Sequence, residues 1–282
     1  MGETGIYIKV DKLQPVNVSK EAYVLRHTSA GGNSEASVNG GKLFGNEKGT
    51  TDGVYNWIYD TDWATKAATN GAPSANYFHN QPVDNSGAYT LTGSWTDVDN
   101  LTGNTTNSDK YGDKKYHVWH YVSENTLPSV SKMIEGLSTG VAFRAVLCDA
   151  QGKAYTKAEL LDKNAPWAWN LTFSESNGGL DVSDLKSGTR HLVKSDNQDA
   201  YALVYYYWNR HNDETANLAK TEPMEFAVVR NHVYKISITK FNTLPREYNP
   251  LDADEVVDAK NKDFEVSMAV MPWGYTQVEM DI

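Results

Sequence analysis

The chain has 282 residues, a formal net charge of −10 and a single cysteine, Cys148, which cannot form an internal disulfide. This length accommodates one large all-β domain or two small ones, and 8 Trp, 17 Tyr and 7 Phe exclude a chain that is disordered throughout. Because nucleic-acid-binding proteins present a basic face, the acidic balance argues against nucleic acid as a partner.

Alternation of apolar and polar residues with a period of two predicts β-strands along most of the chain. In chain order, the predicted strands are 5–10, 22–26, 87–92, 116–122, 141–148, 167–173, 200–208, 225–229, 232–239, 263–271 and 275–282. The stretch 204–208, Val-Tyr-Tyr-Tyr-Trp, is apolar on both faces, so we expect this strand to be covered on both sides.

Helical signals are few and short. Residues 129–137 follow Pro128, which favours a helix start, and predict a short helix. Thr156 and Glu159 have the spacing of a capping box, which predicts a second one. The stretch 57–68 has partial helical spacing and is ambiguous.

The predicted fold class is all-β, an antiparallel sandwich or barrel with short helical insertions and long loops. The longest polar loops are 27–51 and 92–113, and loops of this length are usually functional or disordered. No linker clearly divides the chain, so residues 1–282 are predicted to form a single domain. The start of the chain lacks a signal peptide and reaches a strand by Ile6, so we expect the chain to begin inside a larger protein.

Two acidic stretches raise the possibility of a calcium site. Asp97 and Asp99 begin a stretch that resembles an EF-hand loop, although its fifth and sixth positions do not fit. Asp252 and Asp254 form the second possible cluster. Solvated acidic loops are the alternative, and no other cofactor is indicated.

The sequence contains none of the common catalytic motifs. The chain has no Gly-x-Ser-x-Gly, no His-Glu-x-x-His and no phosphate-binding glycine loop. His117 and His120 are three residues apart, so on a strand they would face opposite sides and could not share one metal. A β-sandwich hydrolase would need a pair of carboxylates, and local context singles out none.

Tryptophan residues could build a platform on which a sugar stacks. Most of them lie in or beside predicted strands, where packing in the core is the commoner fate. A glycan-binding module therefore stays open as an alternative function. The candidates are Trp57, Trp63, Trp95, Trp119, Trp167, Trp169, Trp208 and Trp273.

The C-terminal residues carry an interrupted apolar stripe. A terminal segment of this kind can leave one sheet and enter another, with backbone hydrogen bonds supplying affinity and alternate side chains filling pockets. The alternative is an ordinary terminal strand in its own sheet. The residues of this predicted polymerisation strand are Phe264, Val266, Met268, Val270, Trp273, Val278, Met280 and Ile282.

Three segments resemble the Bacteroidales fimbrillins. Residues 225–238, which include Arg-Asn-His-Val-Tyr at 230–234, look like their Arg-Asn-His-x-Tyr strand pair. Glu-Asn-Thr at 124–126 is similar to a second segment, and 271–282 is similar to their closing Pro-Trp turn and last strand. The resemblance is greatest to the Mfa-type minor fimbrillins, the shaft subunits of the short fimbria, and it covers 121–282.

This resemblance implies a transthyretin-like antiparallel β-sandwich, with 1–282 as the C-terminal domain and 263–282 as donor-type strands. It implies a lipoprotein precursor anchored in the outer membrane. The resemblance also implies that a protease cutting after Arg would remove an N-terminal strand, and that a C-terminal strand of the neighbouring subunit would fill the groove. Asn231 and His232 suit a tight reversal between two strands, so their role would be structural.

The function that follows is that of a non-enzymatic structural subunit of an extracellular cell-surface fimbrium. Its partners would be further copies, accessory tip and anchor subunits, and a host or bacterial surface receptor that supports adhesion and virulence. The rival prediction is an extracellular glycan-binding β-sandwich module.

Overall fold

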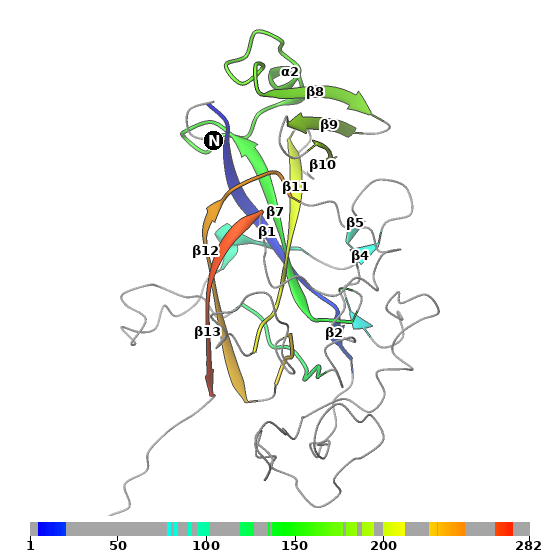
Figure 1. Cartoon of the computed structure of the whole chain (residues 1–282), viewed down its shortest axis with the longest axis vertical. Coiled ribbons are helices and arrows are strands. Elements are labelled where there is room, and N and C mark those ends of the chain that lie inside the picture. The colour runs from blue at the N-terminus through cyan, green and yellow to red at the C-terminus, as the bar shows by residue number, and fades with distance from the viewer. Residues whose placement is uncertain are drawn as a thin grey trace, which may run out of the picture.

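Antiparallel strands dominate the described part of the computed structural model (Figure 1). The residues that it describes are 5–20, 78–79, 82–83, 90–91, 95–101, 119–126, 135, 137–176, 179–184, 188–194, 200–211, 226–229, 231–245 and 263–272. In chain order, its elements are β1 Tyr7–Val16, β2 Val18–Ser19, β3 Phe78–His79, β4 Pro82–Val83, β5 Thr90–Leu91, β6 Thr96–Asp97, η2 Val98–Asn100, β7 Gly140–Cys148, α2 Lys157–Leu160, β8 Leu171–Ser176, β9 Gly179–Asp184, β10 Gly188–Lys194, β11 Tyr201–Trp208, β12 His232–Phe241 and β13 Phe264–Pro272. No helix among these residues is long and apolar enough to span a membrane.

Seven strands form one antiparallel sheet in the order β6-β1-β7-β11-β10-β9-β8. In Figure 1, β1, β7 and β11 run along the long axis, and β8 to β10 gather with α2 at the upper end. The hairpin of β12 and β13 forms a second sheet whose apolar side chains pack against the same core. This arrangement confirms the predicted all-β sandwich.

The strand β1 contains a bulge between Val10 and Lys12, beyond the end of the predicted strand. Ile6, Ile8 and Val10 alternate toward the core, but the next residue that packs there is Leu13, three positions on. The register with β7 shifts between Val10 and Lys12, which leaves Asp11 as the extra residue. Asp11 and Lys12 therefore both face away from the core.

The two central strands, β7 and β11, are buried on both faces. Phe143 of β7 and Leu203 of β11 belong to the hydrophobic core, and the residues that alternate with them, such as Val146 and Val204, are buried as well. Cys148 is buried at the end of β7, and burial raises the pKa of its thiol. The expectation of a central strand covered on both sides is confirmed.

Aromatic side chains join the two layers. The Phe264 ring of β13 lies 5.9 Å from that of Phe143 and 5.6 Å from that of Tyr205, both edge to face. The Phe241 ring of β12 lies 4.8 Å from Tyr205. The Tyr205 hydroxyl donates to the Thr243 carbonyl at 3.0 Å, and burial raises its pKa far above the usual range. Tyr205 thus bonds to the loop that follows β12.

The short helix α2 starts with the predicted capping box. The Glu159 amide donates to the Thr156 hydroxyl at 3.3 Å, and the Thr156 amide donates to the Glu159 carboxylate at 2.7 Å. These hydrogen bonds hold the pKa of the Glu159 carboxyl below its usual value. Leu160 then points into the core, so the cap positions one buried side chain.

Five strand predictions are confirmed, four of them with bounds within two residues, whereas the first ended at Val10 and β1 continues to Val16. The predictions at 5–10, 141–148, 200–208, 232–239 and 263–271 correspond to β1, β7, β11, β12 and β13. The stretch 87–92 contains β5, and 225–229 contains only an isolated bridge at Val228. The predictions at 22–26, 57–68 and 275–282, and most of 129–137, lie outside the described residues.

Two strand predictions are wrong over part of their length. Residues 119–122 are not a strand; Trp119 packs against the core while Tyr121 is exposed. Residues 167–170 form a turn closed by a hydrogen bond from the Asn170 amide to the Trp167 carbonyl, and the strand starts only at Leu171. In both places the aromatic residues suggested a strand, but only one of them, Trp119 or Trp167, packs against the core.

The hairpin of β9 and β10 was not predicted. Its apolar residues Leu180, Val182 and Leu192 face the core, but the residues between them are mostly polar, as befits strands with one solvated face. Gly179 and Gly188 bound the hairpin strands and were the signals available in the sequence.

Candidate assembly surface

The hairpin of β12 and β13 contains the first half of the predicted polymerisation strand. In its antiparallel register, Tyr234 lies opposite Val270, and Ile236 lies opposite Met268. Within the described part of the chain, these two strands pair only with each other. They are long strands in a two-stranded sheet, a form that depends on packing against another layer for stability.

Three of the predicted residues on β13 pack into the chain's own sandwich. Phe264 is 1% exposed and lies in the aromatic contact between the layers. Val266 and Met268 are partly buried and pack against the core, and the Tyr207 hydroxyl donates to the Met268 sulfur at 3.1 Å. Val270 is half-buried in the same strand. These side chains would have to leave their own core if β13 itself were exchanged.

The other predicted residues of this strand follow Pro272. Trp273, Val278, Met280 and Ile282 lie outside the described residues.

The chain turns at Asn231, directly before β12, within the Asn-His-Val-Tyr part of the predicted motif; Arg230 lies outside the described residues. Asn231 has a φ of 60°, in the left-handed region that Asn tolerates better than most residues. The Tyr234 hydroxyl accepts a hydrogen bond from the Val229 amide at 2.8 Å and lies 3.0 Å from Nδ1 of His211. The turn is therefore closed by the tyrosine side chain, which supports the structural role predicted for this segment.

The Glu-Asn-Thr segment meets that turn. The Asn125 amide donates to the Val228 carbonyl at 2.9 Å, and the Val228 amide donates back at 2.8 Å. The buried Asn125 side chain donates to the Leu137 carbonyl at 2.8 Å and to the Thr139 hydroxyl at 2.9 Å. Thr139 in turn donates to the Asn17 carbonyl at 2.8 Å. Asn125 thus links the approach to β12 with β7 and the end of β1.

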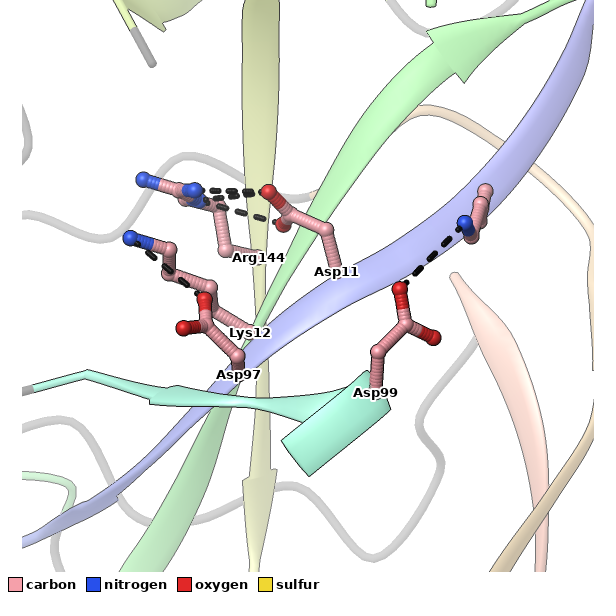
Figure 2. Close-up of polar contacts among 6 residues, drawn as sticks. Asp11, Lys12, Asp97, Asp99 and Arg144 are labelled. Atoms are coloured by element: carbon pink, nitrogen blue, oxygen red, sulfur yellow. Dashed lines mark hydrogen bonds and ion pairs between the residues drawn. The ribbon is translucent and has the colours of Figure 1, made fainter. Parts of the chain in front are cut away.

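The acidic residues of the first predicted calcium stretch lie beside lysines of β1 (Figure 2). The Asp97 carboxylate is 3.6 Å from Nζ of Lys12, and the Asp99 carboxylate is 3.8 Å from Nζ of Lys9. No group of three metal-ligating side chains occurs among the residues that the structure describes. Asp252 and Asp254 lie outside those residues.

Comparison with protein-family models gives one match. Residues 200–279 match the model described as major fimbrial subunit protein type IV, fimbrillin, C-terminal. Residues 200–279 are therefore similar to the C-terminal part of the fimbrillins. The match covers β11, β12 and β13 and includes the Arg-Asn-His-Val-Tyr turn. A search of curated proteins returned no match.

The matched family supports a structural subunit of a cell-surface fimbrium that associates with other fimbrial subunits. The family is structural rather than enzymatic. The finer assignment to the Mfa-type minor subunits stays a prediction.

A group that resembles a catalytic triad lies on β8, β9 and β10 of the chain. The Ser176 hydroxyl is 3.2 Å and the Asp181 carboxylate 2.8 Å from the same ring nitrogen, Nδ1 of His191. A relay needs the two partners on opposite ring nitrogens, so this arrangement does not activate the serine. The other side of the ring packs closely over Gly179. The group instead links neighbouring strands.

The tryptophans of the chain have different fates. Trp167 and Trp208 are buried, Trp119 packs against the core, and Trp95 lies under the Arg144 guanidinium at 5.9 Å. Trp169 is 70% exposed. The described part of the chain therefore offers one exposed indole rather than a row of coplanar rings. Trp57, Trp63 and Trp273 lie outside it.

Proposed function

We propose that this chain joins the next subunit of the fimbrium by strand exchange through its C-terminal residues. The observation that carries the proposal is the position of β13. It lies in a two-stranded sheet with β12 as its one hydrogen-bonded neighbour among the described strands, and residues 273–282 follow it directly. A segment joined to such a strand can pair with another subunit while the sandwich behind it stays intact.

The proposal divides the predicted strand into an anchor and a donor. Phe264, Val266 and Met268 anchor β13 in its own core. Beyond Pro272, apolar Val278, Met280 and Ile282 alternate with polar residues and form the donor stripe. Trp273, at the junction, marks the change between the two. The anchor transmits load from the joint into the sandwich.

The donor stripe carries enough apolar surface to bind a neighbouring subunit stably. Burial of each large apolar side chain contributes about 1.5–3 kcal/mol before the cost of ordering the segment. Three such side chains, together with the ladder of backbone hydrogen bonds, give a contact that dissociates slowly.

The test compares the two faces of residues 277–282 in the full-length protein, in the bacterium that makes it. One variant replaces Val278, Met280 and Ile282 with Ser, and the matched control replaces Gln277, Glu279 and Asp281 with Ser. We expect electron microscopy to show fibres on cells that carry the control and none on cells that carry the apolar-face variant. Deletion of 275–282 should also abolish fibres and leave a folded subunit at the surface.

Fibres of normal length in the apolar-face variant would overturn the strand-exchange proposal. The same holds for loss of fibres in both variants to an equal degree, because strand exchange requires one face to matter more than the other.

The proposal places the assembled protein outside the cell, at the outer membrane, after processing of a lipoprotein precursor. In that position the fimbrium would support adhesion to a host or bacterial surface receptor. Adherence of fibre-bearing and fibre-free cells to a host cell monolayer measures this role, and equal adherence would refute it.

The exposed Trp169 favours a second candidate function, glycan binding. An exposed indole offers a face on which a sugar ring can stack. Trp169→Ala should remove signals on a glycan array, whereas a variant at the exposed Tyr121 serves as the control. An array without hits for the unaltered protein would exclude this candidate.

A further inference from the structure

Residues 95–101 form a strap along one edge of the large sheet, beside β1. The strap contains β6 and η2, and only Thr96 and Asp97 pair with β1. None of its side chains belongs to the hydrophobic cluster that the described residues form. Neither apolar packing in that cluster nor a long ladder therefore holds the strap in place.

Charged pairs connect the strap to β1 (Figure 2). Lys12 and Asp97 are directly opposite in the register, and their charged atoms are 3.6 Å apart. Lys9 and Asp99 form the second pair at 3.8 Å. The four side chains are 18% and 49% exposed in the first pair and 47% and 85% in the second. Solvent and salt therefore reach the second pair at both partners and the first pair through Asp97.

The acidic residues of the strap serve these pairs rather than the local helix. Asp97 stands at the N-cap of η2, where an Asp side chain usually accepts a backbone hydrogen bond, yet it makes no such bond. Its carboxylate instead lies against Lys12 on the neighbouring strand. The Asp97 side chain is therefore oriented toward β1 and not toward the backbone of η2.

Beneath the strap lies a contact of a different kind. The Arg144 guanidinium donates to both carboxylate oxygens of Asp11, with Nη2 to Oδ2 at 2.6 Å and Nε to Oδ1 at 3.1 Å. Arg144 is 5% exposed, and its guanidinium lies against the Trp95 ring of the strap, 5.9 Å from the ring centre. Salt screens a buried pair much less than an exposed one.

We propose that residues 95–101 are a salt-sensitive clasp that closes over the Asp11–Arg144 pair. At low ionic strength the two exposed pairs hold the strap on β1. At high ionic strength these pairs are screened, and the strap detaches and uncovers Arg144 while β1 and β7 stay paired. The clasp is independent of the C-terminal exchange proposed above.

Hydrogen exchange followed by mass spectrometry tests the clasp in the whole chain. The Debye length falls from about 10 Å to about 3 Å between 0.1 M and 1 M NaCl. Loss of two exposed pairs should speed exchange of the peptide 95–101 by about 2- to 30-fold. The peptide 141–147 of β7 should exchange at the same rate in both, which also reports that the fold is intact.

Matched variants separate charge from shape. Asp97→Asn keeps the size of the side chain and should speed exchange of 95–101 at low salt and reduce its salt response. Asp99→Asn should have a smaller effect because Asp99 is more exposed. The exchanged pair Lys12→Asp with Asp97→Lys should restore slow exchange at low salt.

Three outcomes would overturn the clasp. One is equal exchange of 95–101 at both salt concentrations. A second is an Asp97→Asn variant that keeps the full salt response. A third is slower exchange in millimolar CaCl2 at constant ionic strength, which would mean that the two carboxylates bind calcium instead of lysines.

Discussion

Two ladders of the molecule have the same local design and different surroundings. The β1–β7 and β12–β13 pairs each contain nine register pairs interrupted by one bulge. The extra residue is Asp11 in the first ladder and Thr239 in the second. All residues of β7 are buried, whereas no residue of β12 is fully buried. The two ladders thus have the same number of paired residues, but their strands are buried to different extents.

The difference arises from what lies beside and above each ladder. β7 has β11 on its other side and side chains packed on both faces, whereas the hairpin packs through one face. Asp11 consequently binds a buried arginine, and Thr239 donates its exposed hydroxyl to the Glu265 carbonyl at 3.2 Å. Position in the layers, rather than the ladder itself, sets what each residue contributes to stability.

The largest effect is expected when the aromatic contact between the layers is removed. Phe264→Ala should lower the free energy of unfolding by about 3–5 kcal/mol, because it leaves a cavity between β13 and the large sheet. Urea denaturation measures the change, with Glu265→Ala, an exposed neighbour, as control. A loss below about 1 kcal/mol would mean that the hairpin adds little to the sandwich.

The next effect concerns the bulge of the first ladder. Asp11→Ala should cost about 3 kcal/mol, because it leaves the Arg144 charge buried without this carboxylate. The double variant Asp11→Ala with Arg144→Leu should recover most of that loss, since apolar side chains replace a buried ion pair at little cost. A double variant that is less stable than Asp11→Ala would show that the loss does not come from the unpaired Arg144 charge.

A smaller effect is expected at α2, at the end of the large sheet. Thr156→Ala removes the cap and should cost about 1 kcal/mol at neutral pH. The Thr156 backbone amide, which the variant keeps, and the Thr156 hydroxyl, which it loses, both donate to the Glu159 carboxylate and hold the pKa of Glu159 below its usual 4.5. The stabilisation from the hydroxyl bond is fully present above pH 4.5 and lost as the pH falls through the lower folded-state value. The difference in melting temperature between variant and parent should therefore shrink in acid; a constant difference would contradict this account.

The smallest effect is expected at Thr239, the bulge residue of the second ladder that corresponds to Asp11. Thr239→Ala should change the free energy of unfolding by less than about 0.5 kcal/mol, because an exposed hydroxyl regains its hydrogen bond with water. A loss equal to that of Asp11→Ala would show that the bulges, and not their surroundings, set the energetics.

Local pattern alone was sufficient to predict several features of this chain. Alternation located most of the long strands, and Thr156 with Glu159 predicted the cap. The bulge in β1 was not predicted, because the predicted strand ended at Val10. The predicted features depend on contacts within a few residues or on which face of one strand is apolar. The Arg-Asn-His-Val-Tyr turn also carried the family resemblance that the comparison with family models supports.

Only the tertiary structure decided which distant partner each polar or aromatic side chain meets. The lysines beside Asp97 and Asp99, the arginine beside Asp11 and the separate fates of Trp167 and Trp169 all depend on segments brought together from far along the chain. The burial of β7 compared with β12 depends on how many layers cover each strand. A period of two describes the faces of one strand, but what packs against those faces is a property of the whole sandwich.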